Sequence, residues 1–215
     1  MKQVERIARP GKIVCVGRNY AEHAAEMGKD LPEEPLLFLK PPSAVIWNGQ
    51  SIVLHPDSTR VEHEGEIGIV IGERLSWVNA EEALAGIAGI TCVNDVTARD
   101  LQRLDSQWTR AKGFDTFCPV GPRVVPLSEI GDYRDLEIFC RVNGQLRQHG
   151  HARDMHFGIP EIVACISRIM TLEPGDLVAT GTPSGVGPLL EGDTVEVEIP
   201  PVGVLTNSVI SFEDL

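Results

Sequence analysis

The chain has 215 residues, of which 42% are hydrophobic and 23% are charged, and this ordinary balance favours a globular protein over a disordered one. Its formal net charge of −12 opposes binding to nucleic acid and to anionic membranes, so neither is expected as a partner. No apolar run reaches the roughly 18–20 residues of a membrane-spanning helix, and residues 1–12 lack the apolar stretch of a signal peptide. A cytoplasmic location is the simplest expectation.

The cysteines do not form a pattern that predicts disulfides. There are five of them, and no two form a Cys-x-x-Cys pair: Cys15, Cys92, Cys118, Cys140 and Cys165. An odd, scattered set of this kind argues against a disulfide framework and against a zinc knuckle. We expect buried, reduced thiols.

The N-terminal part of the chain predicts a strand followed by a short helix. Residues 12–17 are mostly apolar and predict the strand. Asn19 is placed as the N-cap of the helix and Glu22 as its N3 residue, which is the pattern of a capping box. The helix extends to Met27, and Gly28 is placed to end it.

Further along the chain, apolar runs alternate with turn signals. Two helices are expected, one over residues 79–88 with Asn79 as cap and Glu82 at N3, and one opened by Pro160 that ends before Glu173. The expected strands are residues 36–39, 66–72 and 89–96, together with a hairpin over residues 136–148 that turns at Asn143-Gly144.

Strands therefore dominate the predicted structure and helices are few. We expect one catalytic domain, residues 1–215, that is mostly β. Its fold is predicted to be a rolled β-sandwich or barrel-like, with short helices on the outside.

Carboxylates alternate at the entry to the strongest predicted strand. Side chains two residues apart in a strand share a face, about 6–7 Å apart, so Glu62, Glu64 and Glu66 would point the same way. Like charges this close raise one another's pKa unless a cation neutralises them, although a solvated strand entry is the plainer alternative. Asp95 ends another apolar strand and is either a ligand or a helix cap. Carboxylate ligands favour Mg²⁺, Mn²⁺ or Ca²⁺ over zinc or copper.

Two histidine motifs suggest different chemistry. His23 and Glu26 are three residues apart on the predicted helix and share a face. A glutamate that accepts from one imidazole nitrogen leaves the other nitrogen free as a base, although an exposed polar pair has the same spacing. His149 and His151 could indicate a metal, but their place after a hairpin favours a surface loop.

Other polar residues could hold an anion. Arg99 and Gln102 follow Asp95, and Lys112 lies in a further polar segment; each could bind a carboxylate or steady an oxyanion. The glycine-rich loop at residues 181–187 lacks the Walker pattern and offers backbone N–H groups for an anion, or is a plain tight connection.

Taken together, five stretches resemble the fumarylacetoacetate hydrolase family, in family order and over nearly the whole chain. They are residues 18–23 (RNYAEH), 64–67 (EGEI), 94–102 (NDVTARDLQ), 108–116 (WTRAKGFDT) and 181–187 (GTPSGVG). The family has a β-rich rolled fold, is usually a homodimer, and binds Mg²⁺ or Mn²⁺ and sometimes Ca²⁺.

The resemblance also implies roles for particular residues. Glu64, Glu66 and Asp95 would bind the metal, and Glu62 would stay outside the site. His23 and Glu26 would form a catalytic dyad on a short lid helix, and Lys112 would act with them in catalysis. The residues implied to line the substrate site are Arg18, Tyr20, Arg99, Gln102 and Thr182.

The function that the resemblance implies is the cleavage of a carbon–carbon bond in a small acylpyruvate, such as fumarylpyruvate or acetylpyruvate, with metal stabilisation of the pyruvate enolate. The His23–Glu26 pair favours hydrolysis, because activating water requires a base. The same site could instead serve as an oxaloacetate decarboxylase or as a 2-hydroxyhepta-2,4-diene-1,7-dioate isomerase. A non-catalytic metal-binding protein needs neither the dyad nor Lys112. In each catalytic reading the substrate is a small anionic 2-oxo acid.

Overall fold

The computed structural model describes residues 9–214. The two ends of the predicted domain, and most of the N-terminal segment that was examined for a signal peptide, therefore lie outside the described residues. The strands are β1 (Ile13–Gly17), β2 (Leu36–Lys40), β3 (Val45–Trp47), β4 (Ile52–Leu54), β5 (Val61–His63), β6 (Gly65–Ile71), β7 (Ile87–Asn94), β8 (Thr97–Ala98), β9 (Cys118–Val125), β10 (Glu137–Val142), β11 (Gln145–His151), β12 (Leu177–Ala179), β13 (Gly187–Pro188), β14 (Thr194–Ile199) and β15 (Gly203–Ser211). The α-helices are α1 (Ala21–Glu26), α2 (Ala80–Ala85), α3 (Arg99–Leu104), α4 (Thr109–Gly113) and α5 (Ile159–Ile169). Short 3₁₀ turns are η1 (Pro42–Ala44), η2 (Leu127–Glu129), η3 (Tyr133–Asp135), η4 (Ala152–Asp154) and η5 (Phe212–Asp214).

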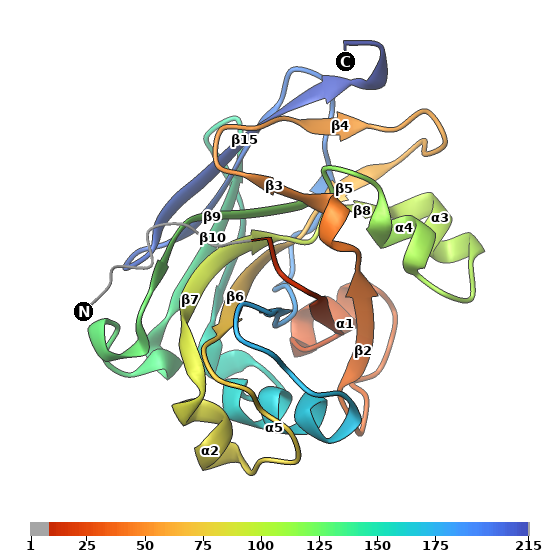
Figure 1. The fold of residues 1–215 in the computed structure, drawn as a ribbon. Helices are drawn as coiled ribbons and strands as arrows, with labels where there is room; N and C mark the ends of the chain where they lie inside the picture. The colour runs from red at the N-terminus through yellow and green to blue at the C-terminus, as the bar shows by residue number, and fades with distance from the viewer. Residues whose placement is uncertain (1–8, 215) are drawn as a thin grey trace.

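The largest sheet curls until its two edges approach each other. Its seven strands have the order β2-β1-β12-β6-β7-β9-β3, so β2 and β3 lie at opposite edges. Only residues 41–44 separate these two strands in the chain, and so short a connection cannot span a flat seven-stranded sheet. Figure 1 shows the resulting curl. The barrel-like, mostly β fold predicted from the sequence is therefore confirmed.

A second sheet, with the order β11-β10-β14-β15-β4, packs against the first. Alternate residues of β10 and β14 are buried, and they join residues of β6 in one hydrophobic core. A smaller core fills the other face of the curled sheet, which explains why every residue of β6 is buried. The helices lie outside the sheets: α2 packs on α5, and α3 and α4 form a second pair beside β2 and β8 (Figure 1).

A third sheet, with the order β13-β5-β8, brings together the segments that carry the polar motifs. The end of the glycine-rich loop pairs with β5, and β5 pairs with the short strand that follows Asp95. Since β5 leads directly into β6, the alternating glutamates lie where the small sheet meets the large one.

Most predicted elements are found close to their predicted positions. The capping box of α2 is present, with Asn79 and Glu82 in the predicted roles, although Gly86 ends this helix earlier than expected. The hairpin turn is present, with positive φ angles at Asn143 and Gly144, and α5 has its proline in the first turn. Two expectations are wrong: Asn19 does not cap α1, whose N-cap is Tyr20, and the two histidines near residue 150 lie on strand β11 rather than in a loop.

The remaining global expectations concern cysteines and membranes. All five cysteines are free, as predicted. Four of them are buried, and Cys165 on α5 is only half-buried. Within residues 9–214, no helix is long and apolar enough to cross a membrane.

Candidate functional site

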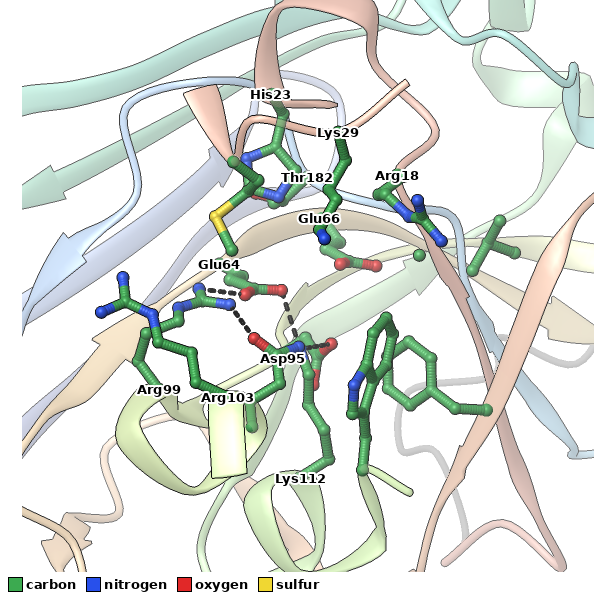
Figure 2. Close-up of a pocket in the computed structure, with 16 residues that line it drawn as sticks. Arg18, His23, Lys29, Glu64, Glu66, Asp95, Arg99, Arg103, Lys112 and Thr182 are labelled. Atoms are coloured by element: carbon green, nitrogen blue, oxygen red, sulfur yellow. Dashed lines mark hydrogen bonds and ion pairs between the residues drawn. The ribbon is translucent and has the colours of Figure 1, made fainter. Parts of the chain in front are cut away.

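A cavity of about 450 Å³ opens beside the junction of the sheets, a volume typical of sites for small molecules. Its wall combines carboxylates, cations and a few apolar side chains (Figure 2). The lining residues are Val16, Gly17, Arg18, His23, Met27, Lys29, Phe38, Glu64, Glu66, Asp95, Arg99, Gln102, Arg103, Trp108, Lys112 and Thr182.

The pairing of β6 with β7 gathers three carboxylates at the base of this cavity. Gly65 is opposite Asn94 in the ladder, so the residues just outside this pair, Glu64 and Asp95, are neighbours. The backbone N–H of Asp95 donates to the carbonyl of Glu64 at 2.8 Å. One carboxylate oxygen from each of Glu64, Glu66 and Asp95 lies within 4.8 Å of the other two, and all three residues are buried. The alternation of glutamates in the sequence therefore does place two of them together with Asp95.

Buried cations neutralise two of these carboxylates. The Lys112 ammonium donates to Glu64 at 2.8 Å and to Asp95 at 2.5 Å. Lys40 donates to the other oxygen of Asp95 at 2.6 Å, and Arg99 forms an ion pair with Glu64. Because Asp95 and Glu64 outweigh the effect of burial, the pKa of Lys112 is raised and its ammonium stays protonated.

Glu66 differs from its two neighbours because it lacks a cationic partner in the part of the chain that the structure describes. Its carboxylate accepts a hydrogen bond from the backbone N–H of Gly181 at 2.8 Å. Burial, together with the charges of Asp95 and Glu64, raises the pKa of Glu66 well above its ordinary value. For Glu64, burial acts in the same direction, but Lys112 and Arg99 outweigh it and lower its pKa.

A buried carboxylate without a counter-charge is costly unless it is neutralised. A divalent cation bound by Glu64, Glu66 and Asp95 would supply the missing positive charge. Their three carboxylates provide the all-oxygen set that Mg²⁺, Mn²⁺ and Ca²⁺ prefer. The residues at this position therefore fit such an ion.

Glu62 shares the alternation of the glutamates but has a different environment. It accepts from Arg99 at 2.7 Å and from Arg60 at 2.6 Å. Arg99 thereby spans Glu62 and Glu64, and it also donates to Gln102 at 2.5 Å. Glu62 fixes the guanidinium that lines the cavity and does not join the carboxylate trio.

The predicted histidine–glutamate pair is present on α1. His23 is buried and lines the cavity, and its Nδ1 lies 3.3 Å from Oε2 of Glu26. The other ring nitrogen, Nε2, is therefore the one left available as a base. Helix α1 is docked on the glycine-rich loop: the Glu26 carboxylate accepts from the N–H of Gly185 at 3.2 Å, and Glu22 accepts from the Ser184 hydroxyl at 3.0 Å.

Three further cations, Arg18, Lys29 and Arg103, line the cavity. Within residues 9–214 none of them forms an ion pair with a carboxylate. Arg18 has a positive φ of 56° at the junction of β1 and α1, a backbone conformation that is unusual for a residue with a side chain. Figure 2 shows Arg18 and Lys29 on one side of the carboxylate trio and Arg103 on the other. The cavity therefore carries positive charge on both sides of the trio, which favours an anionic ligand.

Most of the residues predicted to form the site do lie around the cavity. The exceptions are Glu26 and Tyr20, which are not part of the cavity wall. Glu26 contacts His23, which does line the cavity, and Tyr20 is buried. The Tyr20 hydroxyl has no hydrogen-bond partner among the described residues. Thr182 lines the cavity, but its hydroxyl already donates to the carbonyl of Gly65 at 2.8 Å and accepts from Gln148 at 2.7 Å.

Sequence reasoning missed several residues of the site. Lys40 is the buried last residue of β2, whose other residues are half-buried or exposed, and a lysine directly after an apolar run was the available signal. Gln148 joins three parts of the site, because it bonds to Gly65, to His63 and to the glycine-rich loop. No local signal distinguishes Gln148 from other polar residues of its hairpin.

Comparison with known proteins agrees with this arrangement. Residues 12–210 match the fumarylacetoacetate (FAA) hydrolase C-terminal family. An uncharacterized protein of Pyrococcus abyssi is 52% identical over 211 residues, which cover 96% of this chain and 93% of that protein. The oxaloacetate tautomerase YisK of Bacillus subtilis is 44% identical over 214 residues, which cover 94% of this chain and 71% of that protein.

A solved structure has the same fold. The 2-hydroxyhepta-2,4-diene-1,7-dioate isomerase from Mycobacterium marinum is 46% identical and superposes with a TM-score of 0.87, covering 95% of this chain and 76% of that one. A family match over most of the chain, close relatives and a shared fold lead to one conclusion. The chain belongs to the fumarylacetoacetate hydrolase family of enzymes.

Proposed function

We propose that this protein catalyses keto–enol tautomerisation of a small 2-oxo dicarboxylate such as oxaloacetate. The observation that carries the proposal is the set of three cations, Arg18, Lys29 and Arg103, that face the cavity without a carboxylate partner in the described chain. Oxaloacetate carries a carboxylate at each end, so it can use cations on both sides of the trio. The names of the relatives from Bacillus subtilis and Mycobacterium marinum support a reaction that moves a proton.

Glu64, Glu66 and Asp95 would hold a divalent metal ion, Mg²⁺ or Mn²⁺. When bound, such an ion would supply positive charge that stabilises the negative charge of an enolate. The three carboxylates are themselves buried, and the low local dielectric keeps this charge effective.

His23 is the proposed base in the reaction. Keto–enol exchange moves one proton between C3 and the oxygen on C2, and no other bond is made or broken. The imidazole lines the cavity near Glu64. The positive charge of an imidazolium at this place would lower the pKa of the Glu64 carboxylate. Glu26 holds Nδ1, so that Nε2 can accept a proton and the resulting imidazolium is stabilised.

Lys112 and Arg99 act as donors rather than bases. The pKa of Lys112 is raised by Asp95 and Glu64 against the opposing effect of burial, so it can donate a hydrogen bond to a substrate oxygen at neutral pH. Arg99 is fixed by Glu62 and Glu64, which leaves it pre-oriented for a carboxylate.

A second candidate is the hydrolysis of an acylpyruvate, which the sequence pattern favoured. The His23–Glu26 contact of 3.3 Å supports it, because the same base could activate water. The names of the relatives favour proton transfer over hydrolysis, so this reaction takes second place.

A substrate panel with saturating Mg²⁺ separates the candidates. The ultraviolet absorbance of the oxaloacetate enol measures tautomerisation, a coupled assay of pyruvate measures decarboxylation, and loss of the diketone absorbance of acetylpyruvate and fumarylpyruvate measures hydrolysis. We expect tautomerisation to be accelerated well beyond the other reactions. Rapid hydrolysis without tautomerisation would reject the proposal in favour of the second candidate.

A further inference from the structure

A second cluster of potential metal ligands lies on the five-stranded sheet, outside the cavity. Glu137 on β10 is directly opposite His151 on the edge strand β11, and Phe139 is opposite His149. Since alternate residues of a strand share a face, the carboxylate and both imidazoles emerge on the same outer face. Their side chains are 40%, 42% and 37% exposed for Glu137, His149 and His151, so ions can reach them from solvent.

The spacing of the three side chains suits a small ion. His149 Nε2 lies 2.8 Å from Glu137 Oε2, and His151 Nε2 lies 3.9 Å from the same oxygen. One ligand atom from each residue lies within 4.8 Å of the other two. In a tetrahedral zinc site with metal–ligand distances of about 2.0–2.2 Å, ligand atoms are about 3.3–3.6 Å apart. The observed distances bracket this value, so small side-chain rotations would complete the geometry.

The surroundings hold these side chains in place. The His149 ring stacks on Phe139, with centroids 4.5 Å apart and an interplanar angle of 5°. Arg141, which shares the outer face of β10 with Glu137, is paired with Glu198 at 2.6 Å. The net charge of −12 also attracts cations to the molecule.

We propose that Glu137, His149 and His151 bind a first-row transition metal ion, with Zn²⁺ as the best fit, and leave a fourth position open to water. Two imidazoles and one carboxylate are a zinc-type ligand set. This set differs from the all-carboxylate trio, which suits a harder ion. The two sites would therefore take different metals from the same solution.

The test is a titration of the Mg²⁺-saturated full chain with Zn²⁺ by calorimetry, and with Co²⁺, whose visible absorption reports its ligands. We expect a single Zn²⁺ equivalent that remains in Glu66→Gln, where the cavity trio is incomplete. His149→Ala and His151→Ala should each weaken it. Outer partners of metal ligands contribute about 10- to 100-fold in affinity, so losing a ligand should cost at least that much.

His55→Ala is the matched control. His55 also lies near a carboxylate, with Nδ1 3.7 Å from Asp57, but within residues 9–214 it belongs to no group of three potential metal ligands. The Zn²⁺ affinity of this variant should equal that of the wild type. Because His149 and His151 are 42% and 37% exposed, their variants should stay folded, and melting curves check this. Loss of the Zn²⁺ equivalent in Glu66→Gln, or equal affinity in the wild type and the two histidine variants, would overturn the proposal.

Discussion

At the scale of single residues, Glu66 gives the sharpest argument for a bound cation. Glu64 and Asp95 have lysine and arginine partners, whereas Glu66 has only a backbone N–H in the described structure. This asymmetry is what a divalent ion would correct. Alternation and strand-end position marked Glu62, Glu64, Glu66 and Asp95 as candidates, and only the family resemblance singled out the trio. Neither could predict that Lys40 contacts Asp95 or that Lys112 joins Glu64 to Asp95, because those contacts link segments far apart in the chain.

The first prediction concerns the variant Glu66→Gln. Removal of one anionic ligand should weaken Mn²⁺ binding by at least about tenfold and reduce activity to a similar or greater extent, as measured by electron paramagnetic resonance titration and by the tautomerase assay. Glu62→Gln is the control, since that carboxylate contacts Arg60 and Arg99 and its variant should keep Mn²⁺ binding. Full metal affinity and activity in Glu66→Gln would show that the trio does not hold the ion.

The second prediction concerns the base. His23→Ala should reduce the tautomerisation rate by about 10²- to 10⁴-fold, the usual contribution of general acid–base catalysis. Glu26→Gln should have a milder effect, because it weakens the orientation of the imidazole without deleting it.

Glu22→Gln separates catalysis from docking of the helix. Glu22 also anchors α1, through Ser184, but within residues 9–214 its carboxylate forms no hydrogen bond with the His23 ring, which pairs with Glu26. If Glu22→Gln and Glu26→Gln lose equal activity in steady-state assays, the Glu26 carboxylate serves to hold the helix in place and does not orient His23 as a base.

At the scale of elements, α1 is the part most suited to move. It has six residues and no side-chain N-cap, so it is too short to be stable alone. The contacts of Glu22 and Glu26 with the glycine-rich loop hold it over the cavity.

The third prediction follows from that construction. Amide hydrogen exchange in residues 20–27 should be fast in the free protein and slower when Mg²⁺ and oxalate fill the site, because the ligand adds contacts to His23 and Met27 in the cavity wall. Exchange in the capped helix α2 should stay constant and serves as the internal reference. Equal protection of residues 20–27 in both states would mean that α1 is not a lid.

The fourth prediction concerns the link between α3 and the loop before β5. Burial alone would raise the pKa of Asp100, but hydrogen bonds from Ser58 at 2.6 Å and from Thr59 at 2.8 Å outweigh it and lower the pKa to about 2. A lowered folded-state pKa contributes stability above the ordinary value of 3.8, and this stability is lost as the pH falls towards 2. Asp100→Asn should therefore lower the free energy of unfolding by about 1 kcal/mol at pH 7, after allowance for solvent screening.

Urea unfolding at several pH values checks this prediction. The difference between the wild type and Asp100→Asn should stay constant from pH 7 to pH 5 and narrow below pH 4. Asp57→Asn, on the same loop with a carboxylate that is 68% exposed, should behave as the wild type at every pH. A difference that does not change with pH would mean that the charge of Asp100 is not responsible.

The elements that could be predicted are those that depend on local interactions. The α2 capping box and the Asn143-Gly144 turn are each complete within a few residues. The cap of α1 failed because the Asn19 side chain is used elsewhere: it bonds to Phe157 and to Thr180, more than a hundred positions away in the sequence. Tertiary contacts of this kind override local propensity.

At the scale of the whole molecule, apolar runs and turn signals were enough to predict a rolled, mostly β fold. They could not give the strand order, since β1 pairs in parallel with β12 and β3 with β9 across long stretches of chain. This order matters for function, because it places the ends of β1, β6, β7 and β12 around one cavity. The curl of the large sheet thus creates the site.

Proton exchange at C3 of oxaloacetate, followed by NMR in deuterium oxide, tests the central claim most directly. The same spectra report the loss of the C3 proton signal and any pyruvate that forms. With Mg²⁺, the protein should accelerate exchange beyond the rate in Mg²⁺ buffer alone, with little pyruvate, and EDTA should abolish the acceleration. Exchange no faster than in buffer, or pyruvate formation that keeps pace with exchange, would contradict the account.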